Sequence, residues 1–372
     1  MRVSHYINNP GNVIADNYTT KVLHGSNSLL FHQTLPGYKP TPLVALPALA
    51  AKYGVGQIYV KDESHRFGLN AFKSLGAVYA IHRLLEEDPG LQTFCTATDG
   101  NHGKAVAWGA TLFGKRSVVY VPRDTTQNRM KAIETQGAVV EKVNGNYDDA
   151  CAHAENMCVK HGWQLVQDMA WEGYEKIPAD IVAGYMSLFA EMENTIHTLP
   201  RASVDMVFMQ AGVGSFAAAG VFYYLRRYGL QRPAIIIVEP WEADAVFASF
   251  NHGGITTSPG NASTIMAGLN CGTPSLGAWE LLKNGTDVAL KIDDEYARRA
   301  VRELYYPGND DQRITSGESG AAGLAGFLAI MDQQGPEEVR NMLGIDQHTR
   351  VLFISTEGDT DKEVFDEIIR TT

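Results

Sequence analysis

Short apolar runs alternate with longer amphipathic stretches along most of the chain, the pattern of strands followed by helices. Strands are predicted at 57–61, 93–97, 117–121, 138–143, 164–167, 205–210, 234–239 and 350–355. Helices are predicted at 71–86, 103–113, 127–136, 147–161, 179–197, 215–228, 243–251, 276–284, 293–305, 317–333 and 336–343. The first forty residues show no such pattern, and we expect them to be irregular.

Several of the strand runs are apolar on both faces. The run from Ile235 to Val238 is an example, and it is typical of parallel strands that lie between two layers of helices. Repeated strand–helix units therefore predict an α/β fold with two open, mostly parallel twisted sheets and helices on both faces. In such sheets ligands bind beyond the carboxyl ends of the strands, so we look for chemistry in the loops that follow them.

Composition narrows the classes of function. Of the 372 residues, 45% are hydrophobic and 20% are charged, which argues against disorder. The formal net charge is −11 without a basic block, so nucleic acid and anionic membrane are poor candidates as partners. No apolar run reaches the roughly 18 residues that span a bilayer, and the chain start shows no signal segment. Four cysteines without metal spacing predict a cytoplasmic protein and no metal site.

Two candidates lie at the starts of predicted helices. Lys73 follows Asn-Ala-Phe, and the unfavourable helix dipole should lower its pKa and favour a neutral amine able to form a Schiff base. From its position alone, a solvated lysine in a first turn is the favoured interpretation of Lys73. Asp99 and Asn101 lie in Thr-Asp-Gly-Asn-His-Gly, directly after a strand, where they can reach a ligand. The plain alternative for this stretch is an Asp-Gly turn.

A third candidate is the small-residue stretch that follows the strand at 205–210. Gly212, Val213, Gly214 and Ser215 open the next helix, the context in which backbone amides hold a phosphate. Glu239 ends the following strand, which fits a dinucleotide-binding fingerprint loosely. A nicotinamide or flavin enzyme is therefore a rival hypothesis.

Two further loops combine polar groups after strands. Ser355 and Thr356 begin the loop after the last strand, where Asp361 or Thr360 could also serve as the cap of a helix. Asp168 follows the strand at 164–167 in a loop with two aromatic residues, and it could bind a cationic group of a substrate. The alternative for Asp168 is packing of a surface loop.

The order of these motifs resembles the pyridoxal-phosphate enzymes of the tryptophan synthase β type (fold type II), which include the serine and threonine dehydratases. Within that group the chain looks most like the diaminopropionate ammonia-lyases. The resemblance rests on KDESHRFGLNAFK (61–73), TDGNHG (98–103), VQDMAWEGYEKIP (166–178), IMAGLNCG (265–272) and STEGD (355–359). It implies a large domain of residues 1–71 and 166–372, a small domain of residues 72–165, and a homodimer.

The resemblance also implies roles for single residues. Lys73 would carry pyridoxal 5'-phosphate as a Schiff base, and Asn101 would hydrogen-bond to the phenolic oxygen of its ring. The backbone amides of residues 212–215 would bind the phosphate. Ser355, or its neighbour Thr356, would face the pyridine nitrogen and leave it largely unprotonated, which suits elimination over transamination.

One departure from the wider group concerns Asp99, because the dehydratases usually have Ser at this position. An acid there suits a substrate with a second amine, as a partner of the β-ammonium or as a base. If Lys73 and Asp99 lie on opposite faces of the substrate, each could deprotonate one enantiomer. For Asp168 we expect a contact with the distal ammonium.

The resemblance therefore predicts a carbon–nitrogen lyase that converts 2,3-diaminopropionate to pyruvate and ammonia by α,β-elimination. A serine or threonine dehydratase of the same fold is the nearest alternative. A nucleotide-binding oxidoreductase and a non-catalytic amino-acid-binding module come from other classes. For the ammonia-lyase and for the dehydratase, the expected ligand is a small amino-acid substrate.

Overall fold

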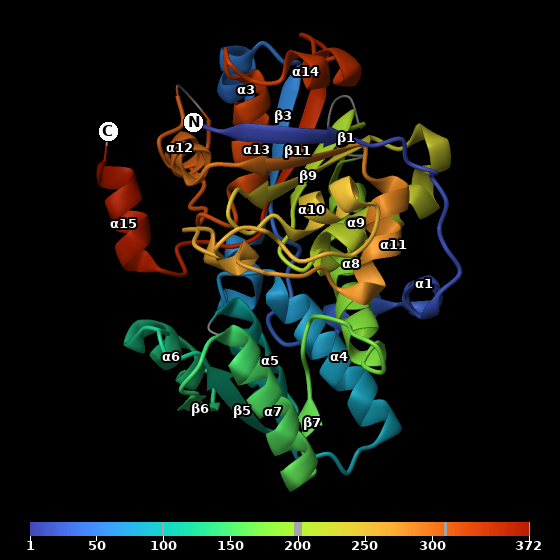
Figure 1. The fold of residues 1–372 in the computed structure, drawn as a ribbon, viewed down its shortest axis with the longest axis vertical. Coiled ribbons are helices and arrows are strands. Elements are labelled where there is room, and N and C mark those ends of the chain that lie inside the picture. The colour runs from blue at the N-terminus through green and yellow to red at the C-terminus, as the bar shows by residue number, and fades with distance from the viewer. Residues whose placement is uncertain (99, 197–202, 309–310, 372) are drawn as a thin grey trace.

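The computed structural model describes residues 1–98, 100–196, 203–308 and 311–371. It contains two sheets, the larger in the upper part of Figure 1 and the smaller in the lower part. The larger sheet has seven strands in the order β1 (Val3–Ile7), β10 (Val288–Ile292), β9 (Ala234–Pro240), β8 (Met206–Gln210), β11 (Arg350–Ser355), β3 (Gln57–Asp62) and β2 (Leu43–Ala45). Only its two edge strands, β1 and β2, run antiparallel to their neighbours.

Helices cover both faces of the larger sheet. One layer consists of α4 (Lys73–Glu87), α8 (Lys176–Ile196), α9 (Ser215–Tyr228), α10 (Ala245–His252) and α11 (Leu276–Gly285), with α1 (Tyr18–Gly25) and α2 (Ser28–Gln33) against α8. The other layer consists of α3 (Pro47–Tyr53), α12 (Asp294–Tyr305), α13 (Ala322–Met331), α14 (Glu337–Leu343) and α15 (Lys362–Arg370). Ile235 and Ile237 pack into the first layer and Ile236 and Val238 into the second, so this run is buried on both faces as predicted.

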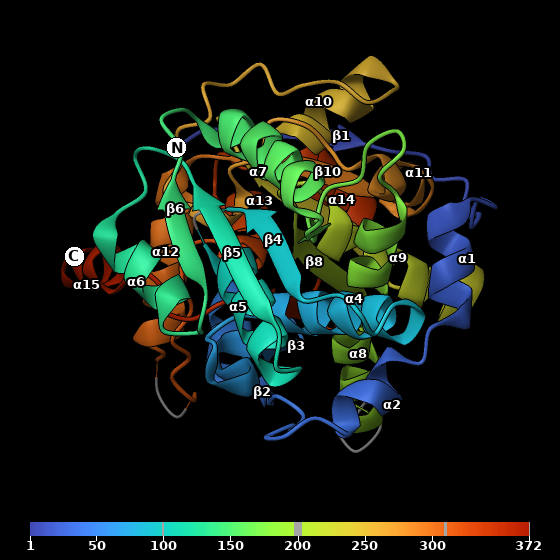
Figure 2. The same cartoon turned by 90° about the horizontal axis from the view of Figure 1, so that it is seen from below.

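The smaller sheet is parallel throughout, in the order β6 (Val139–Lys142), β5 (Arg116–Val121), β4 (Thr93–Ala97) and β7 (Gln164–Leu165). Helix α7 (Tyr147–His161) covers one face, and α5 (Asn101–Leu112) and α6 (Gln127–Glu134) cover the other. Figure 2 shows this sheet from below, with α4 passing beside it toward the larger sheet. The predicted two-sheet α/β architecture is confirmed. No helix in the described part of the chain is long and apolar enough to cross a membrane.

The prediction that the first forty residues are irregular is wrong, because they form β1, α1 and α2. Strand β1 was missed because it lies at a sheet edge and is only half-buried, so its sequence carries no apolar run. Helix α1 did carry a signal: Asn17 and Thr20 exchange hydrogen bonds as a capping box. Helix α13 begins at Ala322 rather than at residue 317, because Gly317 and Gly320 pack against the backbone of residues 357 and 358.

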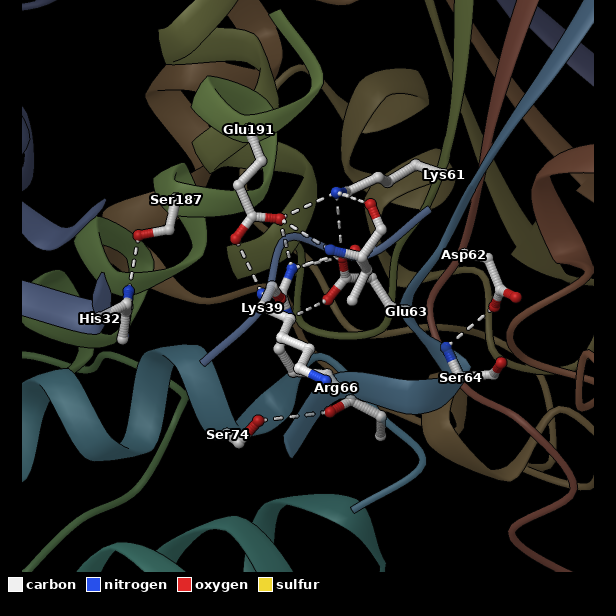
Figure 3. A network of polar contacts seen from close by, with 12 residues as sticks. His32, Lys39, Lys61, Asp62, Glu63, Ser64, Arg66, Ser74, Ser187 and Glu191 are labelled. Carbon is white, nitrogen blue, oxygen red and sulfur yellow. Dashed lines mark hydrogen bonds and ion pairs between the residues drawn. The ribbon is translucent and has the colours of Figure 1, made fainter. Parts of the chain in front are cut away.

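A buried charge network joins β3 to α8 beneath the sheet edge (Figure 3). It consists of Lys61, Glu63, Arg66 and Glu191, none of which is more than 3% exposed. Glu191 accepts hydrogen bonds from Lys61 at 2.8 Å and from Arg66 at 2.7 Å, and Arg66 also donates to Glu63 at 2.7 Å. Burial would raise the pKa of Glu191, but Arg66 and Lys61 lower it to about 2. Two cations thus face two anions, and the network is neutral as a whole.

The network fixes the start of the segment that leads to α4. After Arg66 the backbone is left-handed at Phe67 (φ 51°), at Gly68 (φ 73°) and at Asn70 (φ 58°). Such backbone is unfavourable for the two residues that are not glycine, so the surrounding structure has to hold it in place. The Arg66 contacts hold one end, and at the other end Phe72 N–H donates to the Thr356 carbonyl at 3.0 Å. Helix α4 therefore begins at a fixed place, with Lys73 as its first residue.

Candidate active site

Lys73 and Asp168 form a buried ion pair between α4 and the loop after β7. Lys73 Nζ lies 2.5 Å from Asp168 Oδ2, and the side chains are 20% and 10% exposed. Residues 95 positions apart in the chain are thus brought together at the ends of two different elements. The sequence singled out both residues but did not predict that they pair with each other, and their roles toward cofactor and substrate stay predictions.

The pKa of Lys73 differs from the sequence-based expectation. Burial alone would lower it, but the Asp168 carboxylate and the Tyr185 hydroxyl outweigh burial, and the pKa of Lys73 is raised above its usual value. The expectation of a lowered pKa was therefore wrong, because a paired carboxylate acts more strongly than a helix terminus. Burial would raise the pKa of Asp168, but Lys73 and His102 lower it. Asp168 stays ionised and Lys73 protonated while they are paired.

Two buried polar groups beside the pair lack a partner within the described residues. His102 Nε2 donates to the Val166 carbonyl at 2.8 Å, which leaves Nδ1 unprotonated, 3.8 Å from Asp168 Oδ2 and without a hydrogen bond. Burial lowers the pKa of His102 below its usual value, and Asp168 opposes this shift. The Tyr185 hydroxyl faces Lys73, and within the described residues it too makes no hydrogen bond of normal geometry. Other buried groups in the described part of the chain also lack a hydrogen bond, but these two lie directly beside the ion pair, where a bound ligand could satisfy them.

The glycine stretch meets this ion pair at the start of α9. The Ser215 hydroxyl donates to the Asp168 carbonyl at 2.9 Å, so α9 begins directly beside Asp168. Gly214 has φ 87°, and a Cβ on Gly212 would come within 3.0 Å of Cys271 Sγ, so both positions need glycine. No side chain caps α9, and among the described residues no acceptor is recorded for the backbone N–H groups of residues 214–217. Free amides of this kind at a helix N-terminus are suited to a phosphate.

The rival dinucleotide interpretation needs Glu239 to face a ribose. Glu239 is fully buried, and its carboxylate accepts hydrogen bonds from the backbone of Val246 at 2.8 Å and of Phe247 at 2.6 Å. The carboxylate therefore caps the start of α10 and is not free to bind a sugar hydroxyl. This contact argues against the nucleotide-binding oxidoreductase.

The remaining predicted cofactor residues lie on two neighbouring segments. Asn101 is the first residue of α5, and its amide nitrogen donates to Glu357 Oε2. Ser355 ends β11, Thr356 follows it, and both are buried. The Ser355 hydroxyl donates to Ser316 at 2.8 Å, and the Thr356 hydroxyl accepts from Gln210 at 2.8 Å. Asp99 lies outside the described residues, so its predicted role stays a prediction.

Four residues of the site were not assigned a role from the sequence. His102 was considered only as a metal ligand, and Tyr185 lies in the middle of α8, where nothing in the sequence distinguishes it from a core tyrosine. Gln210 and Glu357 did carry a signal, because they stand at the ends of strands β8 and β11. No group of three or more His, Cys, Asp or Glu residues that could hold a metal occurs in the described part of the chain.

These residues fit pyridoxal phosphate. The free amides at the start of α9 suit its phosphate, and the ion pair of Lys73 and Asp168 lies beside them. Asn101 reaches the same region from α5, through its contact with Glu357. The orphaned His102 Nδ1 and Tyr185 hydroxyl supply polar groups that a bound ligand can satisfy. The roles of the single residues stay predictions.

Comparisons with known proteins agree with this picture. The model of the pyridoxal-phosphate dependent enzyme family matches residues 34–345. Diaminopropionate ammonia-lyase of Escherichia coli (strain K12) is 41% identical over 356 residues, which cover 91% of this chain and 89% of that protein. The enzyme of the same name from Salmonella typhimurium (strain LT2) is 38% identical over 370 residues, 93% and 91% of the two chains. The crystal structure of the E. coli enzyme in complex with an aminoacrylate-PLP azomethine reaction intermediate matches with a TM-score of 0.91 at 38% identity, covering 99% of this chain and 97% of that one.

Proposed function

Because this chain belongs to the pyridoxal-phosphate dependent enzymes and, within them, to the diaminopropionate ammonia-lyase family, we propose that it converts 2,3-diaminopropionate to pyruvate and ammonia by α,β-elimination. One observation supports this more than any other. A buried lysine faces a buried carboxylate beside the free amides of a glycine-rich helix start. The lysine can bind the aldehyde of the cofactor. The carboxylate suits the β-amine of the substrate, and the free amides suit the cofactor phosphate.

When bound, pyridoxal phosphate supplies a ring that takes up the electrons of the broken Cα–H bond. Lys73 is the amine that would hold its aldehyde, and the amides of Gly212, Val213, Gly214 and Ser215 would hold its phosphate. Asn101 would donate to the phenolic oxygen. Ser355 or Thr356 would face the pyridine nitrogen, and a hydroxyl there leaves that nitrogen largely unprotonated.

Asp168 would pair first with the Lys73 ammonium and then with the β-ammonium of the substrate. It pairs with the Lys73 ammonium, and a buried carboxylate that loses its cation is costly. With Lys73 holding the cofactor, the Lys73 ammonium would no longer be there to pair with Asp168, and the β-ammonium of 2,3-diaminopropionate would supply a cation for that carboxylate. Held there in its protonated form, the β-nitrogen leaves as neutral ammonia.

Proton removal from Cα is assigned to Lys73 and Asp99. We infer that Lys73 acts on one face of the substrate and Asp99 on the other, which would allow both enantiomers to react. After release, the aminoacrylate product hydrolyses in water to pyruvate and a second ammonia. His102 Nδ1 lies 3.8 Å from Asp168 Oδ2, and burial lowers the pKa of its ring below the usual value.

The family likeness and the sheet topology also support coarser inferences. All four strands of the smaller sheet fall between residues 93 and 165, which agrees with a small domain of residues 72–165 between two parts of a large domain. We infer that the protein is a cytoplasmic homodimer that acts on a small amino acid and binds neither nucleic acid nor membrane. Sedimentation of the purified holoenzyme tests the dimer.

A substrate panel tests the proposed function directly. The purified enzyme is supplied with D- and L-2,3-diaminopropionate, D- and L-serine and L-threonine, and ammonia and keto acid are both measured. We expect 2,3-diaminopropionate to react fastest and to release two ammonia for each pyruvate. Faster turnover of serine or threonine, with one ammonia for each keto acid, would instead make the protein a dehydratase.

A further inference from the structure

Glu357 is a buried carboxylate that follows the strand β11, two residues after Ser355. It is 6% exposed, and its backbone forms an isolated β-bridge with Ala71, two residues before Lys73. Its carbonyl accepts from Gly317 N–H at 3.0 Å. The position of Glu357 is therefore fixed by two other segments, one of which leads directly to the reactive lysine.

The side chain of Glu357 contacts the first turn of α5, which belongs to the other sheet. The Asn101 amide nitrogen donates to Glu357 Oε2, and Lys104 lies one turn further along the same helix face. Burial lowers the pKa of Lys104, and the charge of Glu357 opposes this shift. Glu357 thus joins the start of α5 to the carboxyl end of β11.

The recorded partners of the Glu357 carboxylate are all donors. Besides Asn101, Ser319 and the Thr360 hydroxyl (3.4 Å) donate to it. Ser319 Oγ accepts from Gly268 N–H at 2.9 Å, so its own proton is free to point at Glu357. An amide side chain can present either its oxygen or its nitrogen, and Glu357 selects the nitrogen when it is ionised. Burial raises the pKa of Glu357, and Ser319, Asn101 and Lys104 oppose that shift. One N–H of Asn101 is then held by Glu357, and the second remains available for a ligand.

We propose that Glu357 is a positioning residue that turns the Asn101 amide so that its nitrogen donates to the phenolic oxygen of pyridoxal phosphate. This inference rests on the proposed function, in which Asn101 is the partner of that oxygen. Glu357 does not itself touch the cofactor. Glutamine at this position can donate as well as accept, so it would allow Asn101 to present its oxygen and would weaken the contact.

A double-mutant cycle on cofactor affinity tests the proposal. The dissociation constant of pyridoxal phosphate is measured by absorbance titration of the apoprotein for the wild type, Glu357→Gln, Asn101→Ala and the double variant. We expect affinity to fall about 10-fold in Asn101→Ala and about 3-fold in Glu357→Gln. The double variant should match Asn101→Ala, because Glu357 acts only through that residue. A loss equal to the product of both effects, or no loss in Glu357→Gln, would overturn the proposal.

Two controls separate this role from general structural support. Asp359→Asn removes a charge from the same loop and near Lys104, and it should leave cofactor affinity unchanged. The melting temperature of the Glu357→Gln apoprotein should equal that of the wild type, whereas a structural role would lower it. If Glu357→Gln does not fold, Glu357→Asp takes its place in the cycle. The shorter side chain keeps the negative charge but moves it away from Asn101. If the wild type binds no pyridoxal phosphate, the proposed function is refuted. If it binds the cofactor but the losses of the two single variants multiply in the double variant, only this inference is refuted.

Discussion

Two buried polar clusters lie on either side of the segment that leads into α4, and they differ in how completely they are satisfied. The buried charge network of Lys61, Glu63, Arg66 and Glu191 is neutral, and each charged group in it has partners at hydrogen-bond distance (Figure 3). The cluster around Lys73 also contains an ion pair. In the described part of the chain, however, His102 Nδ1 makes no hydrogen bond, and the Tyr185 hydroxyl faces Lys73 without a hydrogen bond of normal geometry.

This difference separates a structural role from a functional one. A buried ion network in which every group is satisfied rigidifies its surroundings and offers nothing to a ligand. A cluster that keeps unsatisfied donors and acceptors is stable only because the rest of the fold compensates for it, and proteins keep such defects where they bind or react. Both clusters contain a buried lysine paired with a carboxylate, so burial and pairing alone would not distinguish them.

The largest effect is expected from removal of Lys73. In Lys73→Ala the amine that holds the cofactor is lost, and pyruvate formation should fall on the order of 10³-fold or more. The variant also leaves Asp168 buried without its cation, so the denaturant midpoint is measured alongside activity to separate lost stability from lost chemistry. Pyruvate formation within 10-fold of the wild type would contradict the role of Lys73.

Removal of one member of the buried charge network should affect stability instead. Arg66→Met leaves Glu63 and Glu191 buried without their main partner, and the free energy of unfolding should fall by about 3–5 kcal/mol. The denaturant midpoint of the apoprotein measures this loss. Adding Glu191→Leu should cost less than the sum of the two single changes, because the pair is coupled. Strict additivity would show that the network does not act as a unit.

Asp168 should distinguish substrates by their β-substituent. Asp168→Asn removes the anion that we assign to the distal ammonium, and the KM for 2,3-diaminopropionate should rise about 10- to 100-fold. The KM for serine, whose β-substituent is uncharged, should rise less. An unchanged KM for 2,3-diaminopropionate would remove Asp168 from substrate binding. Equal increases for both substrates would limit it to a general effect on the pocket.

The smallest effect concerns the pH dependence of stability. Burial, together with Glu357, raises the pKa of Glu318 from 4.5 to about 7, and its Oε1 lacks a partner in the described part of the chain. Between these pH values the folded protein keeps a proton that the unfolded chain has lost, so stability falls as the pH rises. Glu318→Gln should therefore exceed the wild type by up to about 3 kcal/mol at pH 8 and equal it at pH 4. Thermal unfolding at both pH values measures this, and an equal difference at both would contradict the shifted pKa.

The sequence predicted those parts of the fold that carry local signals. Helix α7 has the predicted bounds because Asn146 caps its start and Gly162, in left-handed backbone, ends it. Helix α9 was predicted correctly for a similar reason, since Gly214 precedes it. Strands β1 and β10 were missed: β1 is a half-exposed edge strand, and β10 is a short run between two helices. Their pairing depends on contacts between residues almost three hundred positions apart.

Some residues of the candidate site could be predicted from local sequence signals, and others could not. Lys73, Asp168 and the glycine stretch follow strands or open helices, so general rules for parallel sheets bring them together. Tyr185, in the middle of α8, carries no signal in the sequence, and only the packing of α8 against α4 places its hydroxyl beside Lys73. The raised pKa of Lys73 could not be predicted either, because it depends on a carboxylate 95 residues away.

Reductive trapping tests the central claim, that the unsatisfied cluster around Lys73 is where the cofactor binds. The protein is loaded with pyridoxal phosphate, reduced with borohydride and digested, and the labelled peptide is identified by mass spectrometry. The account predicts a single pyridoxyl label on Lys73 and none on Lys61, which the buried charge network holds. A label on Lys61 or Lys104, or no label on Lys73, would contradict it.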